Sequence, residues 1–347
     1  MLNPVIAEDS QIIADRLGGH LSDLSGKTIL VTGTSGFLCS YLVDIFVGIN
    51  ERALEKPLRV IAVDNNFRGT KDRLAHLAED KNIRMIEHDV TQPMDLGEPV
   101  DYIIHGASIA SPTFYRQFPL ETIDVNVNGL RRLLDLGREG AQSIVYLSSS
   151  EVYGDPDPSF IPTPETYHGD VSCTGPRACY DESKRLGETL CVTYASQFDL
   201  PVKMVRPFNV YGPGQRLDDK RIVPDLLLAV RNKQPITLFS DGCATRSFCY
   251  ASDFIFGMLL VLLKGQNGEP YNVGNDTEIS IKDAADIAAN LASPALPIDF
   301  QASTDSDYLT DSPQRRCPDL TEAKKLSFSP SISAKEGFKR TLQSYES

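Results

Sequence analysis

The stretch Thr28-Ile-Leu-Val-Thr-Gly33-Thr-Ser-Gly36-Phe-Leu-Cys39 decides the fold. Its first five residues are β-branched or apolar and predict a buried strand, and a helical pattern starts at Phe37, directly after the second glycine. Glycine permits a tight strand-to-helix turn, and the unpaired N–H groups at the helix amino end can donate to a pyrophosphate. We therefore predict a dinucleotide site whose contacts are made by Gly33, Ser35, Gly36, Phe37 and Leu38.

The same alternation continues through the first 206 residues. Short β-rich runs at 28–32, 59–63, 83–87, 102–105, 144–148 and 202–206 alternate with segments of helical period at 37–48, 124–139 and 181–198. Strands that are apolar almost throughout and separated by helices indicate a parallel sheet covered on both faces. The predicted fold class is α/β, a Rossmann-like doubly wound parallel sheet with a smaller C-terminal lobe.

The sequence pattern changes at two points along the chain. Residues 1–25 are predicted to form a short helical extension that ends at two glycines, and residues 26–206 the dinucleotide-binding domain. From 207 to 347 Pro and Gly interrupt the chain, which predicts a smaller and discontinuous lobe, with a segment at about 245–275 returning to the first domain. Within this lobe, helices are expected at 280–291 and 334–344.

A carboxylate at the end of the second strand identifies the dinucleotide. Asp64 can accept both ribose hydroxyls and would repel a 2′-phosphate, which favours NAD over NADP, with Asn65 beside it. Asp89 and Val90, after the third strand, fit an adenine contact, although a carboxylate that serves only its own turn is nearly as good an interpretation. Cys39 stands where Gly or Ala is usual, at a position that serves helix-to-strand packing, and cysteine is small enough for it.

Composition limits the classes of function. The 347 residues are 41% hydrophobic and 23% charged, with a net charge of −13 at pH 7, so we expect neither nucleic acid nor a membrane surface as a partner. The longest apolar run, 254–263, is half the length of a bilayer span. Seven scattered cysteines and five histidines lack ligand spacing, so no metal is predicted. Free thiols and an acidic amino terminus predict a cytoplasmic protein.

Three residues predict the chemistry. Tyr180 and Lys184 are four residues apart and so share a helix face, where the ammonium would favour the phenolate and make Tyr180 a general base. Bringing a phenol from a pKa of ~10 towards ~7 takes roughly 4 kcal/mol. Such a pair also occurs as a plain surface contact, but Ser149 ends the fifth strand, at the sheet edge where α/β folds bind ligands. Together the three residues predict proton and hydride removal from a secondary alcohol.

These motifs resemble, in their order, the extended short-chain dehydrogenase/reductase family, from about Lys27 to about residue 340. The matching stretches are Thr32-Gly-Thr-Ser-Gly36-Phe-Leu, His105-Gly-Ala-Ser108, Ser149-Ser-Glu-Val-Tyr-Gly154, Tyr180-Asp-Glu-Ser-Lys184, Arg206-Pro-Phe-Asn209-Val-Tyr-Gly-Pro and Thr245-Arg246-Ser-Phe. The resemblance implies a nucleoside-diphosphate-sugar enzyme with tightly held NAD, which Ala107, Tyr180 and Lys184 would also contact. Residues 207–347 would then form the nucleotide-sugar lobe. Asn209, Arg221 and Arg246 would face the diphosphate or nucleotide, although either arginine could be structural.

Within the family, the chain looks most like the UDP-glucuronate decarboxylases, which make UDP-xylose. The stretch Gly175-Pro-Arg-Ala-Cys-Tyr-Asp-Glu-Ser-Lys-Arg185 carries this resemblance best, with shorter ones at 87–90, 110–112 and 150–156. The implied reaction begins when Tyr180 takes the C4 hydroxyl proton as hydride moves to NAD. The resulting β-keto acid loses CO₂ to give an enolate that Tyr180 and Ser149 stabilise, and C5 is then protonated and the hydride returned.

The residues expected beside the sugar help to distinguish between the reactions of the family. The family's 4,6-dehydratases have an Asp–Glu pair where this chain has Ser150-Glu151, which argues against water elimination. Glu151 is predicted to act at C5, or else only to hydrogen-bond sugar hydroxyls. Ser111 and Tyr115 match the family's Ser-Pro-x-x-Tyr segment and are candidate sugar contacts. Arg116 and Arg185 are nearby charges for the sugar carboxylate, but a loop arginine usually faces solvent and Arg185 could pair within its helix.

Two alternatives remain open. A 4-epimerase or 4-dehydrogenase acting on another nucleotide sugar would use the same Ser149, Tyr180 and Lys184 without a carboxylate partner, and an NAD-binding regulator would use none of them for chemistry. The family usually forms homodimers by pairing two helices from each subunit, here expected around 124–139 and 181–198. Leu130, Leu133 and Leu134 fit that pairing or the sheet face.

Overall fold

A seven-stranded sheet forms the centre of the computed structural model, which describes residues 2–346 except 68, 70, 220 and 302–313. All its strands are parallel, in the order β11-β6-β5-β4-β1-β2-β3. The strands are β1 (Thr28–Thr32), β2 (Arg59–Asp64), β3 (Ile83–Glu87), β4 (Tyr102–His105), β5 (Ser143–Leu147), β6 (Val202–Pro207) and β11 (Pro270–Val273). The predicted Rossmann-like doubly wound sheet is confirmed, with β11 as an additional edge strand.

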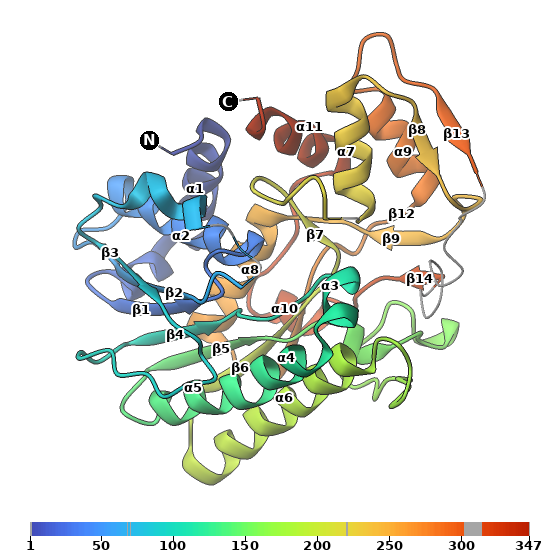
Figure 1. The fold of residues 1–347 in the computed structure, drawn as a ribbon. Coiled ribbons are helices and arrows are strands. Elements are labelled where there is room, and N and C mark those ends of the chain that lie inside the picture. The colour runs from blue at the N-terminus through green and yellow to red at the C-terminus, as the bar shows by residue number, and fades with distance from the viewer. Residues whose placement is uncertain (1, 68, 70, 220, 302–313, 347) are drawn as a thin grey trace.

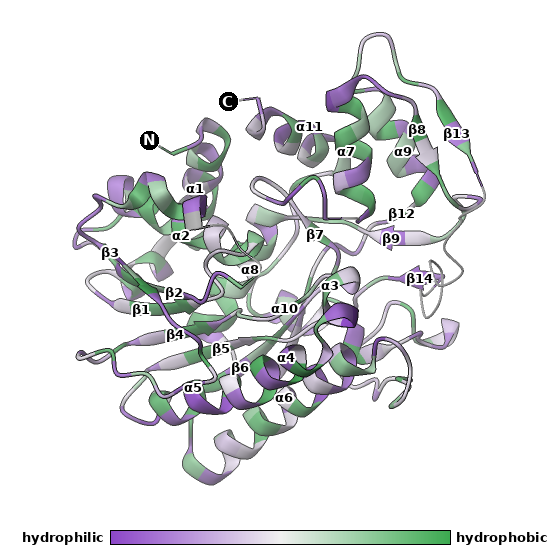
Figure 2. Cartoon of the chain, viewed as in Figure 1, coloured by the Kyte–Doolittle hydropathy of each residue, from purple (hydrophilic) through white to green (hydrophobic). Residues whose placement is uncertain are grey.

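Helices cover both faces of the sheet (Figure 1). On one face lie α1 (Pro4–Leu17), α2 (Phe37–Arg52) and α8 (Ala251–Lys264), and on the other α4 (Pro119–Asp124), α5 (Leu130–Gly137) and α6 (Ala178–Phe198). Strand β1 shows how the sequence produces two cores: Ile29 and Val31 point into one, and Leu30 between them into the other. Apolar residues, green in Figure 2, fill the middle of β1 and β2.

The predicted helix at 124–139 is interrupted. A π-helical turn, Val125–Gly129, separates α4 from α5. It lies where Asn126 is fully buried, accepts a hydrogen bond from Ser108 Oγ at 2.8 Å and donates one to Ser183 Oγ at 2.9 Å. The wider turn therefore coincides with a buried polar contact that joins the end of β4 to α6.

A third core belongs to the C-terminal part of the chain. It is built by α7 (Ile222–Asn232), α9 (Ile281–Ala289) and α11 (Ala334–Ser344), with the aromatic rings of Tyr211, Phe248 and Phe338 between them. The smaller elements are α3 (Pro112–Gln117), β7 (Val210–Tyr211), β8 (Ile236–Leu238), β9 (Thr245–Ser247), β10 (Cys249–Tyr250), β12 (Glu278–Ser280), β13 (Ile298–Phe300), β14 (Arg315–Arg316) and α10 (Thr321–Lys325). The predicted helices at 280–291 and 334–344 correspond to α9 and α11.

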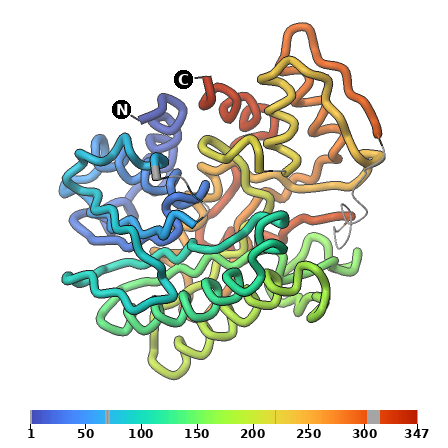
Figure 3. The backbone as a smooth tube through the Cα atoms, viewed as in Figure 1, coloured from blue at the N-terminus to red at the C-terminus, as the bar shows by residue number. Residues whose placement is uncertain are grey.

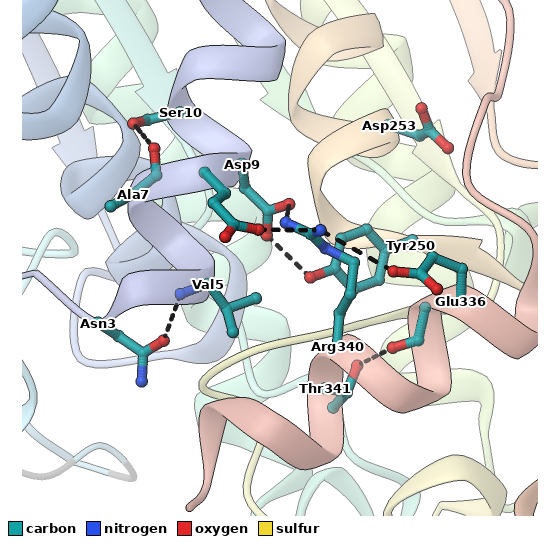
Figure 4. A network of polar contacts seen from close by, with 12 residues as sticks. Asn3, Val5, Ala7, Asp9, Ser10, Tyr250, Asp253, Glu336, Arg340 and Thr341 are labelled. Carbon is teal, nitrogen blue, oxygen red and sulfur yellow. Dashed lines mark hydrogen bonds and ion pairs between the residues drawn. The ribbon is translucent and has the colours of Figure 1, made fainter. Parts of the chain in front are cut away.

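The first helix ties these parts together. Asp9 on α1 has no exposed surface and accepts hydrogen bonds from Tyr250 on β10 at 2.8 Å and from Arg340 on α11 at 2.9 Å (Figure 4). Tyr41 on α2 also donates to it, at 2.8 Å. On the same helix Arg16 pairs with Asp253 of α8 at 2.5 Å. The two ends of the chain lie side by side in Figure 3, and the amide of Asn3 donates to the Ser344 carbonyl at 3.0 Å. Among the described residues, no helix has the length and apolarity needed to span a membrane.

Candidate active site

A cavity of about 560 Å³ lies at the carboxyl ends of the central strands. It receives the turn after β1, the ends of β2, β4 and β5, the start of α6 and the amino end of α7. Of the predicted site residues, the cavity is lined by Gly33, Gly36, Phe37, Leu38, Asp64, Asn65, Asp89, Val90, Ala107, Tyr115, Ser149, Ser150, Glu151, Tyr180, Lys184, Asn209 and Arg221. Ser35, Ser111 and Arg246 are not part of its lining but lie on adjoining elements.

The dinucleotide end has the shape that a pyrophosphate needs. Gly33 has φ +82°, and a Cβ there would come within 2.7 Å of the backbone of Ala107. Gly36 precedes α2 without a side-chain cap, so the first N–H groups of the helix have no side-chain acceptor and face the cavity. Cys39 packs where predicted, since a Cβ on Gly106 would lie 2.3 Å from its sulfur. These features fit the diphosphate of NAD.

Two carboxylates follow the neighbouring strands. Asp64 accepts hydrogen bonds from the Ser35 N–H at 2.8 Å and the Asn66 N–H at 2.7 Å, and its side chain stays at the cavity wall, as the ribose contact requires. Asp89 also lines the cavity, but one of its oxygens accepts from both the N–H and the hydroxyl of Thr91 at 2.9 Å. Asp89 thus stabilises its own turn whatever else it contacts.

Helix α6 and strand β5 bring the predicted catalytic groups together. Lys184 is 2% exposed, and its Nζ donates to the Leu147 carbonyl at 2.8 Å and lies 5.7 Å from the centre of the Tyr180 ring. Tyr180 is buried and hydrogen-bonded to Ser149. Its ring stacks on that of Tyr115, with centroids 5.1 Å apart and planes 13° from parallel. The phenol therefore has one polar neighbour and one aromatic face fixed in advance.

Burial governs the protonation of this pair. It lowers the pKa of Lys184 to about 7 and raises that of Tyr180 to about 12, although the bond with Ser149 acts to lower the latter. In the folded chain burial is the largest influence on the pKa of both groups, so the role of Lys184 in making Tyr180 a general base stays a prediction.

Glu151 is held by arginines that the sequence analysis missed. Arg177 and Arg316 each form an ion pair with its carboxylate, and Arg246 adds a third positive charge nearby. Burial acts to raise the pKa of Glu151, but these arginines outweigh it and bring the pKa to about 2. Arg177 lies in the predicted 175–185 stretch, so its place before Tyr180 could have suggested it. Arg316 had no such signal, since 165 residues separate it from Glu151.

The other polar residues near the sugar end divide into two groups. Tyr115 and Ser111 are buried, and the hydroxyl oxygen of each has no hydrogen-bond partner within the described ranges, as expected of groups that meet a ligand. Arg116 is exposed and is absent from the lining of the cavity. Arg185 donates to the carbonyls of Val152 and His168 and approaches Glu182. Neither Arg116 nor Arg185 lines the cavity, and the carboxylate roles considered for them stay predictions.

The three residues that were predicted to face the diphosphate or nucleotide each contact other parts of the chain. Asn209 donates to the Ser247 carbonyl at 3.2 Å, and Arg221 pairs with Asp219 at 2.9 Å at the start of α7. Arg246, on β9, donates to the Thr245 carbonyl at 2.7 Å, and burial lowers its pKa to about 10. Within the described part of the chain, no group of three or more His, Cys, Asp or Glu side chains is arranged to hold a metal ion.

Several known proteins are similar to this chain in sequence. The chain is 38% identical over 318 residues to UDP-glucuronic acid decarboxylase 1 of Arabidopsis thaliana, covering 91% of this chain and 69% of that protein. UDP-glucuronic acid decarboxylase 5 of the same plant is 38% identical (90% and 87% covered), and the Xenopus tropicalis decarboxylase 1 is 36% identical (93% and 73%).

Solved structures of similar fold include two epimerases. A UDP-glucuronic acid 4-epimerase from Bacillus cereus, solved with UDP-glucuronic acid and NAD, has a TM-score of 0.74 at 25% identity, with 92% of this chain and 99% of that one covered. A UDP-N-acetylglucosamine 4-epimerase from Methanobrevibacter ruminantium M1 has a TM-score of 0.80 at 21% identity (93% and 99%). The model of the NAD dependent epimerase/dehydratase family matches residues 29–274. The chain belongs to the NAD dependent epimerase/dehydratase family.

Proposed function

We propose that the protein is an NAD-dependent UDP-glucuronate decarboxylase. The observation that carries the proposal is the group of three arginines around Glu151: Arg177, which lines the cavity, and Arg316 pair with its carboxylate, and Arg246 acts on it as a third positive charge. Arginine binds a carboxylate through charged hydrogen bonds, so a sugar that carries a carboxylate suits this group better than a neutral sugar does. The decarboxylases that are 36–38% identical over most of the chain support the same substrate.

The residues present are suited to the one proton that leaves and returns at the C4 oxygen. When bound, NAD⁺ accepts a hydride from C4, returns it at the end of the reaction, and brings a positive charge that favours the Tyr180 phenolate. Tyr180 removes the proton from the C4 hydroxyl while Ser149, its hydrogen-bond partner, holds that oxygen. Once CO₂ has left the β-keto acid, the same two hydroxyl groups stabilise the enolate oxygen. Tyr180 finally returns its proton to the C4 oxygen.

The remaining predicted contacts keep their roles as proposals. Lys184, fixed by the Leu147 carbonyl, has further N–H groups to offer the dinucleotide. Asn209 and Arg221 line the cavity away from the Gly33 turn and are proposed to hold the diphosphate of the sugar nucleotide, with Arg246 beside them. Ser111, Tyr115 and Ser150 are proposed to meet the sugar.

Incubation with UDP-glucuronate tests the proposal. We expect CO₂ and a UDP-pentose in equal amounts, measured by trapping the gas and by mass spectrometry of the nucleotide sugar. Formation of a UDP-hexuronate with inverted C4 and no CO₂ would instead identify a 4-epimerase, the activity named for the Bacillus cereus structure. The matched control is UDP-glucose, which has no carboxylate to lose.

We further propose a homodimer located in the cytoplasm. The seven cysteines are free thiols, which supports a reducing compartment. Leu130, Leu133 and Leu134 pack into the sheet core and are not available for pairing. Instead α4 and α6 expose large apolar side chains, and a second copy of these two helices would cover them. They are Leu120, Ile123, Leu186, Val192 and Phe198.

A further inference from the structure

A second cavity, of about 340 Å³, adjoins the sugar end of the active site. It is formed by the chain just after Glu151, by the loop that precedes α6 and by the first turn of α6. Glu151 and Arg177 line both this cavity and the active site. Their ion pair therefore forms a shared wall between the two spaces.

Asp181 lies on the far side of that wall. It is 6% exposed and lines the second cavity, and its Oδ2 lies 3.5 Å from Nε of Arg177. Its Oδ1 is buried and has no hydrogen-bond partner in the described part of the protein. A buried carboxylate oxygen without a partner is costly, and the cost falls when the group carries a proton or binds water.

Charges of both signs influence the pKa of Asp181. Burial and the charge of Glu151 raise its pKa to about 7, while Arg177 and Arg316 act to lower it. The titratable and charged groups around it are Arg177 and Tyr180 on its own segment, Glu151, Arg316 from β14, Tyr115 from α3, and Asp155 and Asp170 at the cavity. Asp181 therefore exchanges a proton near neutral pH, whereas Glu151, with a pKa of about 2, does not.

Decarboxylation needs a proton that the catalytic phenol cannot supply. The bond between C5 and the carboxylate breaks, its electron pair enters the enolate, and a new C5–H bond forms when a proton arrives. The proton that Tyr180 takes from the C4 hydroxyl goes back to the same oxygen. Each turnover therefore consumes one proton from solvent, as the sugar carboxylate and H⁺ become CO₂ and the pentose.

We propose that Asp181 takes this proton from the second cavity and passes it, through water, across the Glu151–Arg177 wall to C5. The inference rests on the proposed decarboxylase function. Asp181 supplies the proton through water and does not contact the sugar itself, so we class it as a positioning residue and not as a catalytic one. Asp181 lines the second cavity, the Glu151–Arg177 pair separates that cavity from the active site, and the unpartnered oxygen of Asp181 gives the proton a place to reside.

The variant Asp181→Asn tests the proposal, since it keeps the shape of the side chain and removes its exchangeable acid proton. In single-turnover experiments with UDP-glucuronate, we expect CO₂ to be released at the wild-type rate and the UDP-pentose to form on the order of tenfold more slowly. Wild-type pentose formation should slow as the pH rises above about 7, because Asp181 then loses its proton. The variant should lack this part of the pH dependence.

Matched variants separate proton supply from structure. Glu182→Gln changes the next carboxylate on α6, whose side chain is 38% exposed and pairs with Arg185, and it should behave as wild type. Asp181→Glu keeps a carboxylic acid and should retain a pH dependence, with its midpoint displaced from that of wild type. Thermal melting and NAD content are measured on each purified protein. If Asp181→Asn does not fold, Asp181→Glu decides: a pH profile identical to wild type in its position overturns the proposal, because a different acid must shift it.

The two proposals fail in different ways. If wild-type protein releases no CO₂ from UDP-glucuronate, the decarboxylase function is wrong and this inference falls with it. If wild-type protein releases CO₂ and Asp181→Asn keeps both the wild-type rate of pentose formation and its pH profile, proton supply through Asp181 alone is refuted. Slow pentose formation after rapid CO₂ release supports it.

Discussion

Lys184 shows how a buried charge links function to stability. It is 2% exposed, its Nζ bonds to a backbone carbonyl, and its pKa falls to about 7 in the folded protein, against about 10.4 in an unfolded chain. Between these two values the unfolded state binds more protons than the folded state, so this residue makes stability rise with pH. Below pH 7 both states are protonated and the contribution is constant.

We therefore expect wild type to gain stability relative to Lys184→Met between pH 7 and pH 9. The slope is at most about 1.4 kcal/mol per pH unit, the value for one proton. Denaturant unfolding of both proteins at each pH measures the difference, in which other titrating groups cancel. A difference that stays level, or falls, across this range would contradict a lowered pKa of Lys184.

Arg316 offers a test of carboxylate recognition. In a Tyr180→Phe background, which removes the hydroxyl proposed to be catalytic, Arg316→Gln should weaken UDP-glucuronate binding by roughly 10- to 100-fold, the range for a lost charged hydrogen bond. Affinity for UDP-glucose should change little, because that sugar has no carboxylate. Calorimetry measures both. Arg315→Gln is the control, since Arg315 is its exposed neighbour and pairs with Glu278 at 2.8 Å. An equal loss of affinity for UDP-glucuronate and UDP-glucose would exclude carboxylate recognition by Arg316.

Helix α1 depends on one buried carboxylate. Asp9 joins α1 to Tyr41, Tyr250 and Arg340, and replacing it by Asn removes the buried carboxylate from Arg340, which keeps the more exposed Glu8 and Glu336 as ion-pair partners. Breaking a buried pair costs at most about 3–5 kcal/mol. We expect Asp9→Asn to lower the melting temperature by roughly 10 °C. Glu8→Gln, at a side chain that is 69% exposed, should change it by less than about 2 °C. Similar melting temperatures for the two variants would refute this stabilising role of Asp9.

At the scale of elements, the sequence predicts what local pattern controls. The turn at Gly33 and the strands at 59–63 and 83–87 were readable because apolar runs and glycines act within a few residues. The break at Val125–Gly129 was not, since it coincides with contacts that Asn126 makes to Ser108 and Ser183, far along the chain. Strand β11 was missed as an element because four residues between loops carry little pattern.

The whole molecule decides the rest of the site. Ser149, Tyr180 and Lys184 belong to short motifs and were predicted, whereas the partners of Glu151 were not. Arg316 reaches it from β14, a two-residue strand brought in only by folding of the C-terminal part. Protonation also needs the folded state, because the pKa of Tyr180 is set mainly by burial.

The proposed dimer makes its prediction at this scale. Leu186 and Val192 on α6 are 46% and 48% exposed. Replacing both by Glu should convert a protein of twice the 38.2 kDa chain mass into a monomer, as measured by light scattering. NAD should remain bound, because the residues of α6 that line the cavity are buried and these two are exposed. Phe300→Glu, at a 52% exposed apolar position on β13, away from α4 and α6, is the control. A wild-type monomer would refute the dimer.

The contact between Asn3 and Ser344 has a practical consequence for engineering. Because the first and last helices touch, a linker of a few residues could join the two termini and the backbone could be reopened at an exposed loop elsewhere. Such a circular permutant would keep α1 and α11 covalently joined at their outer ends. New ends placed near the opening of the cleft would allow a reporter group to be attached there without lengthening any loop that lines it.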